Sequence, residues 1–184
     1  LPYLLLTIGV GLFLSRYGKT TFKYFPGVLL LCIPEFYLHS GVVSTDMFLS
    51  FSIGLIMLSF WEAIKDDSKT YWKYLFFLGL ALGLLAKGPI AVILTLPPIA
   101  LWCLITNNIK RAFKALPWIL GIILLFSISL PWYYLAEKSN PGFYDYFIKG
   151  EHFERYFNPG WKGDKYGFVK QQPFGIIWIF FIIS

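Results

Sequence analysis

The chain has few charged side chains. They make up 14% of its 184 residues, whereas hydrophobic residues make up 57% and aromatic residues 21%. A soluble domain of this length needs many more polar side chains to cover its surface. The scarcity of charge therefore excludes an ordinary soluble domain and favours a chain embedded in a lipid bilayer.

The motifs of several other protein classes are missing as well. The sequence has no P-loop, no Gly-x-Gly-x-x-Gly loop and no zinc-ligand spacing. The two cysteines, Cys32 and Cys103, lie inside apolar segments, so we expect small membrane-buried side chains rather than a disulfide or a metal site. The net charge of +6 comes from separate loops, which excludes a nucleic-acid partner. No signal peptide is present and both ends are apolar, so we expect an internal piece of a longer protein.

Long apolar segments separated by short polar joints fill most of the chain. Each is about 15 to 22 residues long, and about 20 residues are needed to cross a bilayer as a helix. The pattern predicts an all-α fold, a polytopic transmembrane helical bundle of about seven spans, two of them cut short. We expect one transmembrane domain over residues 1–184. The segments are residues 1–15, 25–43, 47–64, 71–86, 90–107, 113–136 and 171–184.

The joints alternate in charge. Every second joint is basic, and the short joints between them carry Asp46 and Lys87. By the positive-inside rule the basic joints are cytoplasmic, which puts Asp46, Lys87 and the loop 137–170 on the extracytoplasmic side. The basic joints contain Arg16, Lys19 and Lys23, then Lys65, Lys69 and Lys73, then Lys110, Arg111 and Lys114.

The loop 137–170 contains aromatic residues at roughly helical spacing, with charged residues between them. This pattern predicts an amphipathic helix lying in the outer membrane interface. Within it, His152, Arg155 and Tyr156 share one α-helical face and could bind an anionic headgroup. Alternatively, the helix is simply solvated and carries a Glu151–Arg155 pair worth a few tenths of a kcal/mol.

Three ionisable residues share a stripe of the second segment. Glu35, His39 and Asp46 fall within about 40° of one another on a helix. Such groups in a membrane usually face the bundle interior or a wet cavity. The alternative is that Glu35 pairs locally and His39 is satisfied at the interface.

Asp46 and Lys87 each allow two interpretations. Asp46 precedes a new apolar helix and could cap it, worth about 1 kcal/mol. Lys87 could complement a helix dipole, with Gly88 ending that helix and Pro89 starting the next. Alternatively, both charges serve chemistry at the outer edge of the membrane, because a lysine beside a tight turn can hold a phosphate.

Four short motifs occur in a familiar order: residues 44–47 (Ser-Thr-Asp-Met), 86–89 (Ala-Lys-Gly-Pro), 131–133 (Pro-Trp-Tyr) and 150–153 (Gly-Glu-His-Phe). Over nearly its whole length the chain resembles GT-C membrane glycosyltransferases related to 4-amino-4-deoxy-L-arabinose lipid A transferase and the dolichyl-phosphate-mannose–protein mannosyltransferases. The resemblance implies transfer of a sugar from a polyprenyl-phosphate donor to a lipid, glycan or protein acceptor. It also implies action on the extracytoplasmic side of a bacterial inner membrane.

The resemblance also implies roles for individual residues. Lys87 would stabilise the donor phosphate, and Asp46 would help to organise the polar cavity. His152, with Glu151, would lie near the donor or hold a divalent metal, the one cofactor implied. The catalytic carboxylate is expected upstream of Leu1, so no residue of this chain is assigned as the base. Arg155 and Tyr156 join the donor-binding set from helical spacing alone.

Two other functions stay open. A transporter or flippase of lipid-linked saccharides would use the stripe of Glu35, His39 and Asp46 to line a passage. Transporters usually show related, broken-helix repeats, and the sequence shows none. A polymerase or ligase of surface polysaccharide would share the donor and differ in its acceptor.

Overall fold

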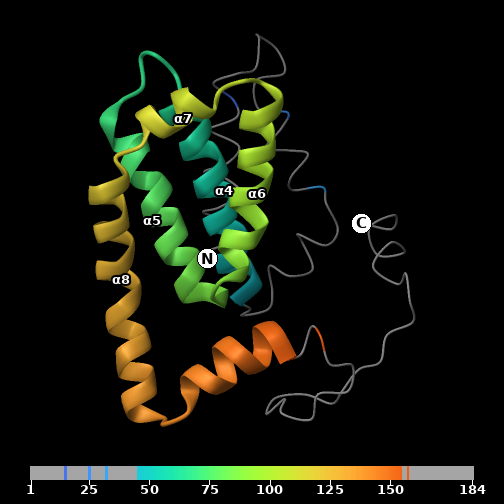
Figure 1. Ribbon diagram of the computed structural model, residues 1–184, viewed down its shortest axis with the longest axis vertical. Helices are drawn as coiled ribbons and strands as arrows, with labels where there is room; N and C mark the ends of the chain where they lie inside the picture. Colours follow the sequence, from blue (N-terminus) through green and yellow to red (C-terminus); the bar gives the residue numbers. More distant parts are fainter. Residues whose placement is uncertain (1–14, 16–24, 26–31, 33–44, 155–156, 158–184) are drawn as a thin grey trace. The chain divides into compact units, whose positions relative to one another are not determined.

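The structure is a computed structural model that describes residues 45–154 and the single residues 15, 25, 32 and 157 (Figure 1). Contacts divide the chain into two compact units, and the single transmembrane domain over residues 1–184 stays a prediction. The first unit is Leu1–Phe51 with Gln172–Ser184, and the second is Ser52–Gln171. The second unit contains nearly all of the described residues.

Residues 45–154 form helices joined by short turns, and no strand occurs in this range. The predicted all-α class is therefore confirmed for the described part. Three predicted segments, 47–64, 71–86 and 90–107, match helices to within two residues at each end. The helices are α4 (Thr45–Ala63), α5 (Thr70–Lys87), α6 (Ile90–Ile105), α7 (Ile109–Ala115), α8 (Trp118–Ser139) and the π-helix η2 (Asp145–Glu154).

Two of the described helices, α4 and α8, are long and apolar enough to cross a membrane, and α6 is a shorter apolar helix. Two lysines, Lys73 and Lys87, lie within the 18 residues of α5 and lower its mean hydropathy. The predicted segments 1–15, 25–43 and 171–184 lie almost entirely outside the described residues. The number of spans beyond α4 and α8 therefore stays a prediction.

The sixth predicted segment differs from the structure. The sequence predicts one apolar helix over 113–136, but the chain forms the short helix α7, breaks, and resumes as α8 at Trp118. The break has a local cause. Leu116 is extended (φ −95°, ψ 133°) because a residue before a proline, here Pro117, is disfavoured in the helical region.

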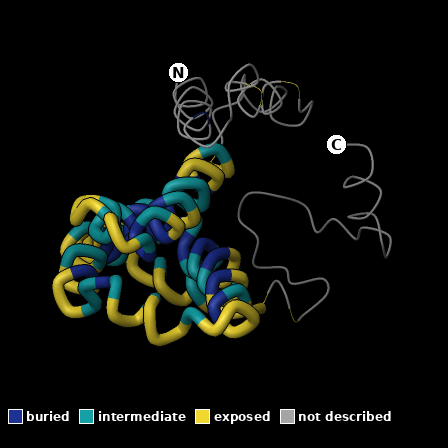
Figure 2. Tube along the Cα trace, turned by 90° about the horizontal axis from the view of Figure 1, so that it is seen from above, coloured by how far each residue is buried: buried dark blue, intermediate teal, exposed yellow. Residues whose placement is uncertain are grey.

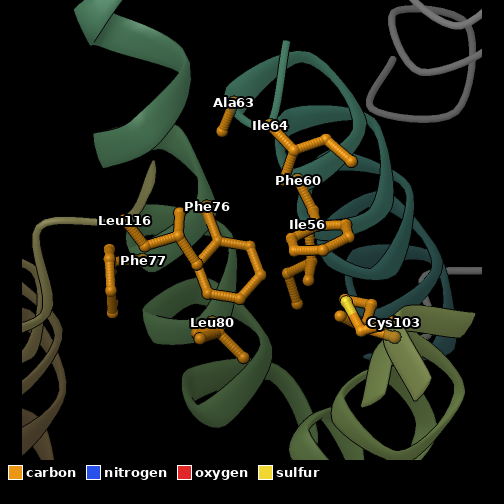
Figure 3. Close-up of a cluster of buried hydrophobic side chains, with 10 residues drawn as sticks. Ile56, Phe60, Ala63, Ile64, Phe76, Phe77, Leu80, Cys103 and Leu116 are labelled. Carbon is orange, nitrogen blue, oxygen red and sulfur yellow. The ribbon is translucent and has the colours of Figure 1, made fainter. Parts of the chain in front are cut away.

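Helix α5 is the centre of the described bundle and packs against α6 and α8. The buried side chains around it are aliphatic and aromatic, with Phe60, Phe76 and Phe77 the largest among them (Figure 3). Phe76 lies 6.1 Å from Phe60 of α4 and 5.2 Å from Phe77, measured between ring centroids. Phe77 in turn lies 5.8 Å from Trp118 at the start of α8. The buried cluster consists of Ile56, Phe60, Ala63, Ile64, Phe76, Phe77, Leu80, Ile99, Cys103 and Leu116.

Small residues let these helices approach closely. A Cβ placed at Gly83 of α5 would lie 2.5 Å from the Cβ of Ala91 in α6. A Cβ at Gly121 of α8 would overlap the ring of Phe77. Close backbone approach through small residues is the usual way in which helices associate inside a membrane, where apolar burial alone gives little drive.

Helices α5 and α8 run in the same direction, which defines the two ends of the bundle. Phe77 lies beside Trp118 early in α8, and Leu84 lies beside Tyr133 late in α8. At the opposite end, the Arg111 guanidinium of α7 pairs with Asp66 of the α4–α5 loop at 2.8 Å. In Figure 1, α7 lies at one end and η2 at the other. Two basic joints thus share one end, and Lys87 lies at the other.

The outer surface of this bundle is apolar. Figure 2 shows the buried residues on the inward sides of the helices and exposed residues around them. Only 11% of the apolar stretch of α8 is buried, and Ile119 and Tyr134 are 78% and 64% exposed. A soluble protein rarely exposes so continuous an apolar surface, so this face is typical of a helix in contact with lipid.

Candidate functional site around the end of helix α5

Lys87 is the last residue of α5, and the turn that follows it is tightly packed. The N–H of Gly88 donates to Leu84 O at 2.9 Å and ends the helix. Gly88 is buried with φ +68°, a conformation that favours glycine. A Cβ there would also lie 2.9 Å from Phe147 and 3.0 Å from His152. The sequence Lys-Gly-Pro thus serves both the turn and the approach of η2.

Two side chains from later in the chain bond to carbonyl groups of this last turn. The Tyr133 hydroxyl of α8 donates to Leu84 O at 2.7 Å. The Nε2 atom of His152 in η2 lies 3.0 Å from Lys87 O. Carbonyls at the end of a helix lack partners within the helix, so side chains commonly satisfy them. The backbone that carries Lys87 is therefore held by α8 and by η2.

Both ring nitrogens of His152 face carbonyl oxygens. The Nδ1 atom lies 2.6 Å from Phe147 O, and Nε2 lies close to Lys87 O. A carbonyl can only accept, so each bond needs an N–H on the ring. A neutral imidazole makes one of these bonds, and a ring protonated on both nitrogens makes both. The bond from Nε2–H to Lys87 O joins η2 to the end of α5, and the ring makes it when Nε2 carries a hydrogen.

The helix η2 is a π-helix, so side chains five residues apart meet on it. The Tyr146 hydroxyl donates to Glu151 Oε1 at 2.8 Å, and the ring of Phe147 packs edge-on against His152 at 5.0 Å. A helix is therefore present in the described part of the loop 137–170, with a period other than the α-helical one expected, and its amphipathic, interfacial character stays a prediction. Arg155 and Tyr156 lie outside the described residues, and their place beside His152 stays a prediction.

A turn built around Glu137 connects α8 to η2. The Glu137 carboxylate accepts the N–H groups of Gly142 and Tyr144 at 3.0 and 2.8 Å. Beyond this turn, the rings of Phe143 and Phe147 stack with centroids 5.2 Å apart, and both lie near Tyr133. These contacts hold the start of η2 against the end of α8.

An exposed ion pair lies on η2. The Lys149 ammonium lies 2.5 Å from Asp145 Oδ1. The hydrogen bond to Asp145 and the charge of that carboxylate raise the pKa of Lys149 above its ordinary value. The pair therefore favours the charged form of Lys149.

Asp46 lies exposed in the first turn of α4, where a carboxylate complements the helix dipole. It belongs to the first compact unit, whereas Lys87 and His152 belong to the second. The structure brings Lys87 and His152 together, and the convergence of Asp46 with them stays a prediction. Glu35 and His39 lie outside the described residues.

The residues of the predicted metal site are engaged elsewhere. Glu151 accepts from Tyr146, and both nitrogens of His152 face carbonyls. Within the described residues, no three side chains of the metal-binding types His, Cys, Asp or Glu gather as a ligand set. The described residues thus do not form a metal centre, and metal binding by Glu151 and His152 stays a prediction. Cys32 and Cys103 are both free, and Cys103 is buried.

Sequence reasoning missed Tyr133 and Glu137 as parts of this site. Tyr133 belongs to the motif at residues 131–133, but the sequence assigns it no role in the site, because its partner Leu84 lies 49 residues away. For Glu137, the signal was local: Asn140, Pro141 and Gly142 mark a turn within reach of its side chain. An open apolar hollow of about 580 Å³ elsewhere on α8 is lined by that helix alone, including Phe126 and Tyr134, and contains none of the site residues.

In the described part of the chain, apolar helices with exposed apolar faces surround a polar helix end, which is typical of a helical membrane protein. A family model described as dolichyl-phosphate-mannose-protein mannosyltransferase matches residues 1–147. The chain belongs to this family, which confirms the resemblance found in the sequence. No curated protein and no solved structure matches it. Family membership makes the chain a membrane glycosyltransferase of the type that uses a lipid-linked sugar donor.

Proposed function

We propose that this chain forms part of an enzyme that transfers a sugar from a polyprenyl-phosphate donor on the extracytoplasmic side of a bacterial inner membrane. The acceptor is a lipid such as lipid A, a glycan or a protein. Lys87 neutralises the donor phosphate. The observation that supports this role best is the double attachment of its helix end, through Tyr133 to Leu84 O and through His152 to Lys87 O.

A phosphate leaving group gains negative charge as the sugar departs. A cation fixed beside it stabilises that charge without having to reorganise during the reaction. Lysine binds phosphate as a point charge on a flexible stem, so its value depends on how firmly its backbone is held. The two hydrogen bonds to the last turn of α5 supply that support.

The end of a helix is otherwise a poor place for an anion, because its unpaired carbonyls carry partial negative charge. Here Leu84 O accepts from both the Gly88 N–H and the Tyr133 hydroxyl, and the His152 ring faces Lys87 O. Helix α6 begins directly after Pro89, and the N-terminal end of a helix favours an anion. The capped end of α5 and the start of α6 are thus compatible with a phosphate held by Lys87.

The remaining assignments rest on the sequence. Asp46 would help to organise the acceptor side of the cavity, and Arg155 and Tyr156 would contact the donor headgroup. Glu151 and His152 would border the donor from η2. No residue of the chain is assigned as the base that deprotonates the acceptor.

The test is transfer activity of the full-length protein with defined polyprenyl-phosphate sugars, scored by the mass shift of candidate acceptors. Lys87→Ala should lower turnover by roughly 10²- to 10³-fold, the usual loss when one charge-stabilising group is removed. Lys138→Ala, a lysine in the last turn of α8, is the matched control and should retain activity within about twofold.

Membrane levels of both variants should equal those of the wild type. Wild-type turnover in Lys87→Ala would overturn the role of Lys87. Movement of the donor across the membrane with no glycosylated product, by the wild-type protein, would instead favour a transporter.

A further inference from the structure

We propose that α7, together with the α4–α5 loop, forms a docking surface for anionic phospholipid headgroups at the end of the bundle opposite Lys87. This surface, named here the α7 platform, comprises Lys65, Asp66, Asp67, Lys69, Lys73 and residues 109–115. It is independent of the proposed transfer reaction, because none of its residues lies near the end of α5.

The seven residues of α7 divide into three faces. Ala112 and Ala115 are partly buried and pack against the core. Ile109 and Phe113, four residues apart, form an apolar edge that is 45% and 65% exposed. Lys110, Arg111 and Lys114 are exposed on the third face. A helix lying in the membrane interface has the same three faces: one contacts the protein, one contacts acyl chains and one contacts headgroups.

Aromatic contacts fix the apolar edge at the junction with α8. The ring of Phe113 stacks on Trp118 with centroids 5.0 Å apart. The Trp118 Nε1–H donates to Phe113 O at 2.9 Å. Tryptophan is enriched at the depth of the headgroups, where its ring is apolar and its N–H is polar. Helix α7 therefore lies where the apolar length of α8 begins.

Charge selects anionic over neutral lipid. The end of the bundle formed by Glu62 and the platform carries six basic and three acidic residues, a net charge of +3. Glu62 pairs with Lys65 at 2.7 Å and Asp66 pairs with Arg111, which leaves Asp67 as the one acid outside these pairs at this end. Within the described part of the chain, no ion pair or hydrogen bond engages the ammonium groups of Lys69, Lys73, Lys110 and Lys114.

Clusters of four to eight basic residues on an interfacial helix bind anionic headgroups through charge, at a distance shorter than the Debye length. The cations of the platform are spread over one interfacial surface rather than around a pocket. The occupant that fits is therefore the anionic phospholipid of the leaflet in which α7 lies, such as phosphatidylglycerol, with acyl chains against Ile109 and Phe113.

The experiment titrates the full-length protein in neutral detergent with phosphatidylglycerol or phosphatidylcholine and counts bound lipids by native mass spectrometry. The wild type should bind phosphatidylglycerol more tightly. The double variant Lys110→Gln/Lys114→Gln should bind it roughly 25-fold more weakly, since each basic residue near a membrane surface contributes about fivefold. The double variant and the wild type should bind phosphatidylcholine equally.

The matched control is Lys138→Gln/Lys149→Gln, which removes two exposed lysines at the other end of the bundle and should leave binding unchanged. Equal loss in the control would overturn the proposal, because the effect would then follow net charge alone. Unchanged binding in Lys110→Gln/Lys114→Gln would also overturn it. Thermal unfolding of each variant shows whether the fold is kept. The variant Phe113→Ala keeps every charge, so it should weaken phosphatidylglycerol binding less than the double lysine variant does.

Discussion

At the residue scale, the hydrogen bond from Tyr133 to the end of α5 can be tested for its effect on stability. Tyr133 is buried, and its hydroxyl reaches Leu84 O, whereas the neighbouring Tyr134 is largely exposed. Tyr133→Phe removes one buried hydrogen bond and leaves a carbonyl with fewer donors, which should lower the free energy of unfolding by about 1 kcal/mol. Tyr134→Phe should change it by less than about 0.5 kcal/mol. Thermal unfolding in detergent measures both.

If the hydroxyl of Tyr133 also holds the backbone of Lys87 in place, Tyr133→Phe should reduce turnover as well. The loss of turnover should be larger than the loss of stability alone would cause. A variant that is as stable and as active as Tyr134→Phe would contradict the hydrogen bond seen in the structure.

The same residues show what the sequence could predict of the site. Lys-Gly-Pro is a local signal, and it placed Lys87 correctly at the end of a helix. Tyr133 and His152 lie 49 and 65 residues from the carbonyls that they bond, and no pattern along the chain encodes those pairs. The charged residues were predictable as candidates, whereas their hydrogen-bond partners depended on how α5, α8 and η2 pack.

At the scale of elements, the sequence predicted the long helices because their apolar runs are continuous. It missed α7, whose seven residues include three basic ones and so have the composition of a polar joint. It also assigned η2 the period of an α-helix. In the π-helix, Tyr146 meets Glu151 and Phe147 meets His152, pairs five residues apart that α-helical spacing does not place together.

The position of η2 depends on His152. In His152→Ala, η2 loses the imidazole ring that faces Phe147 O and Lys87 O, so the helix should open more often. We expect amide hydrogen exchange over residues 145–154 to rise roughly fivefold or more, because at least one hydrogen bond of about 1 kcal/mol is lost. Phe153→Ala, at an exposed neighbouring position, is the control and should leave exchange nearly unchanged. Equal exchange in both variants would show that other contacts hold η2.

The packing of α5 on α6 depends on Gly83. A Cβ at this position would lie 2.5 Å from the Cβ of Ala91, which is bonded directly to the backbone of α6 and cannot rotate away. Gly83→Ala should therefore cost about 1–3 kcal/mol as the two helices separate. Gly54→Ala is the matched control, since a Cβ there would meet no described atom within 4 Å, and helix propensity favours alanine. Similar unfolding temperatures for the two variants would show that α5 and α6 can move apart without cost.

For the molecule as a whole, the main prediction is the direction in which the bundle crosses the membrane. Helix α8 has 22 residues and is about 33 Å long, so the platform of α7 and the end that carries Lys87 lie about one bilayer thickness apart. The basic joints should face the cytoplasm. In a variant with both native cysteines replaced by alanine, Lys149→Cys should react with an impermeant maleimide in intact cells. Asp67→Cys, equally exposed in the α4–α5 loop, should react only after the membrane is opened. The reverse pattern would place Lys87 on the cytoplasmic side, where an extracytoplasmic sugar donor could not reach it.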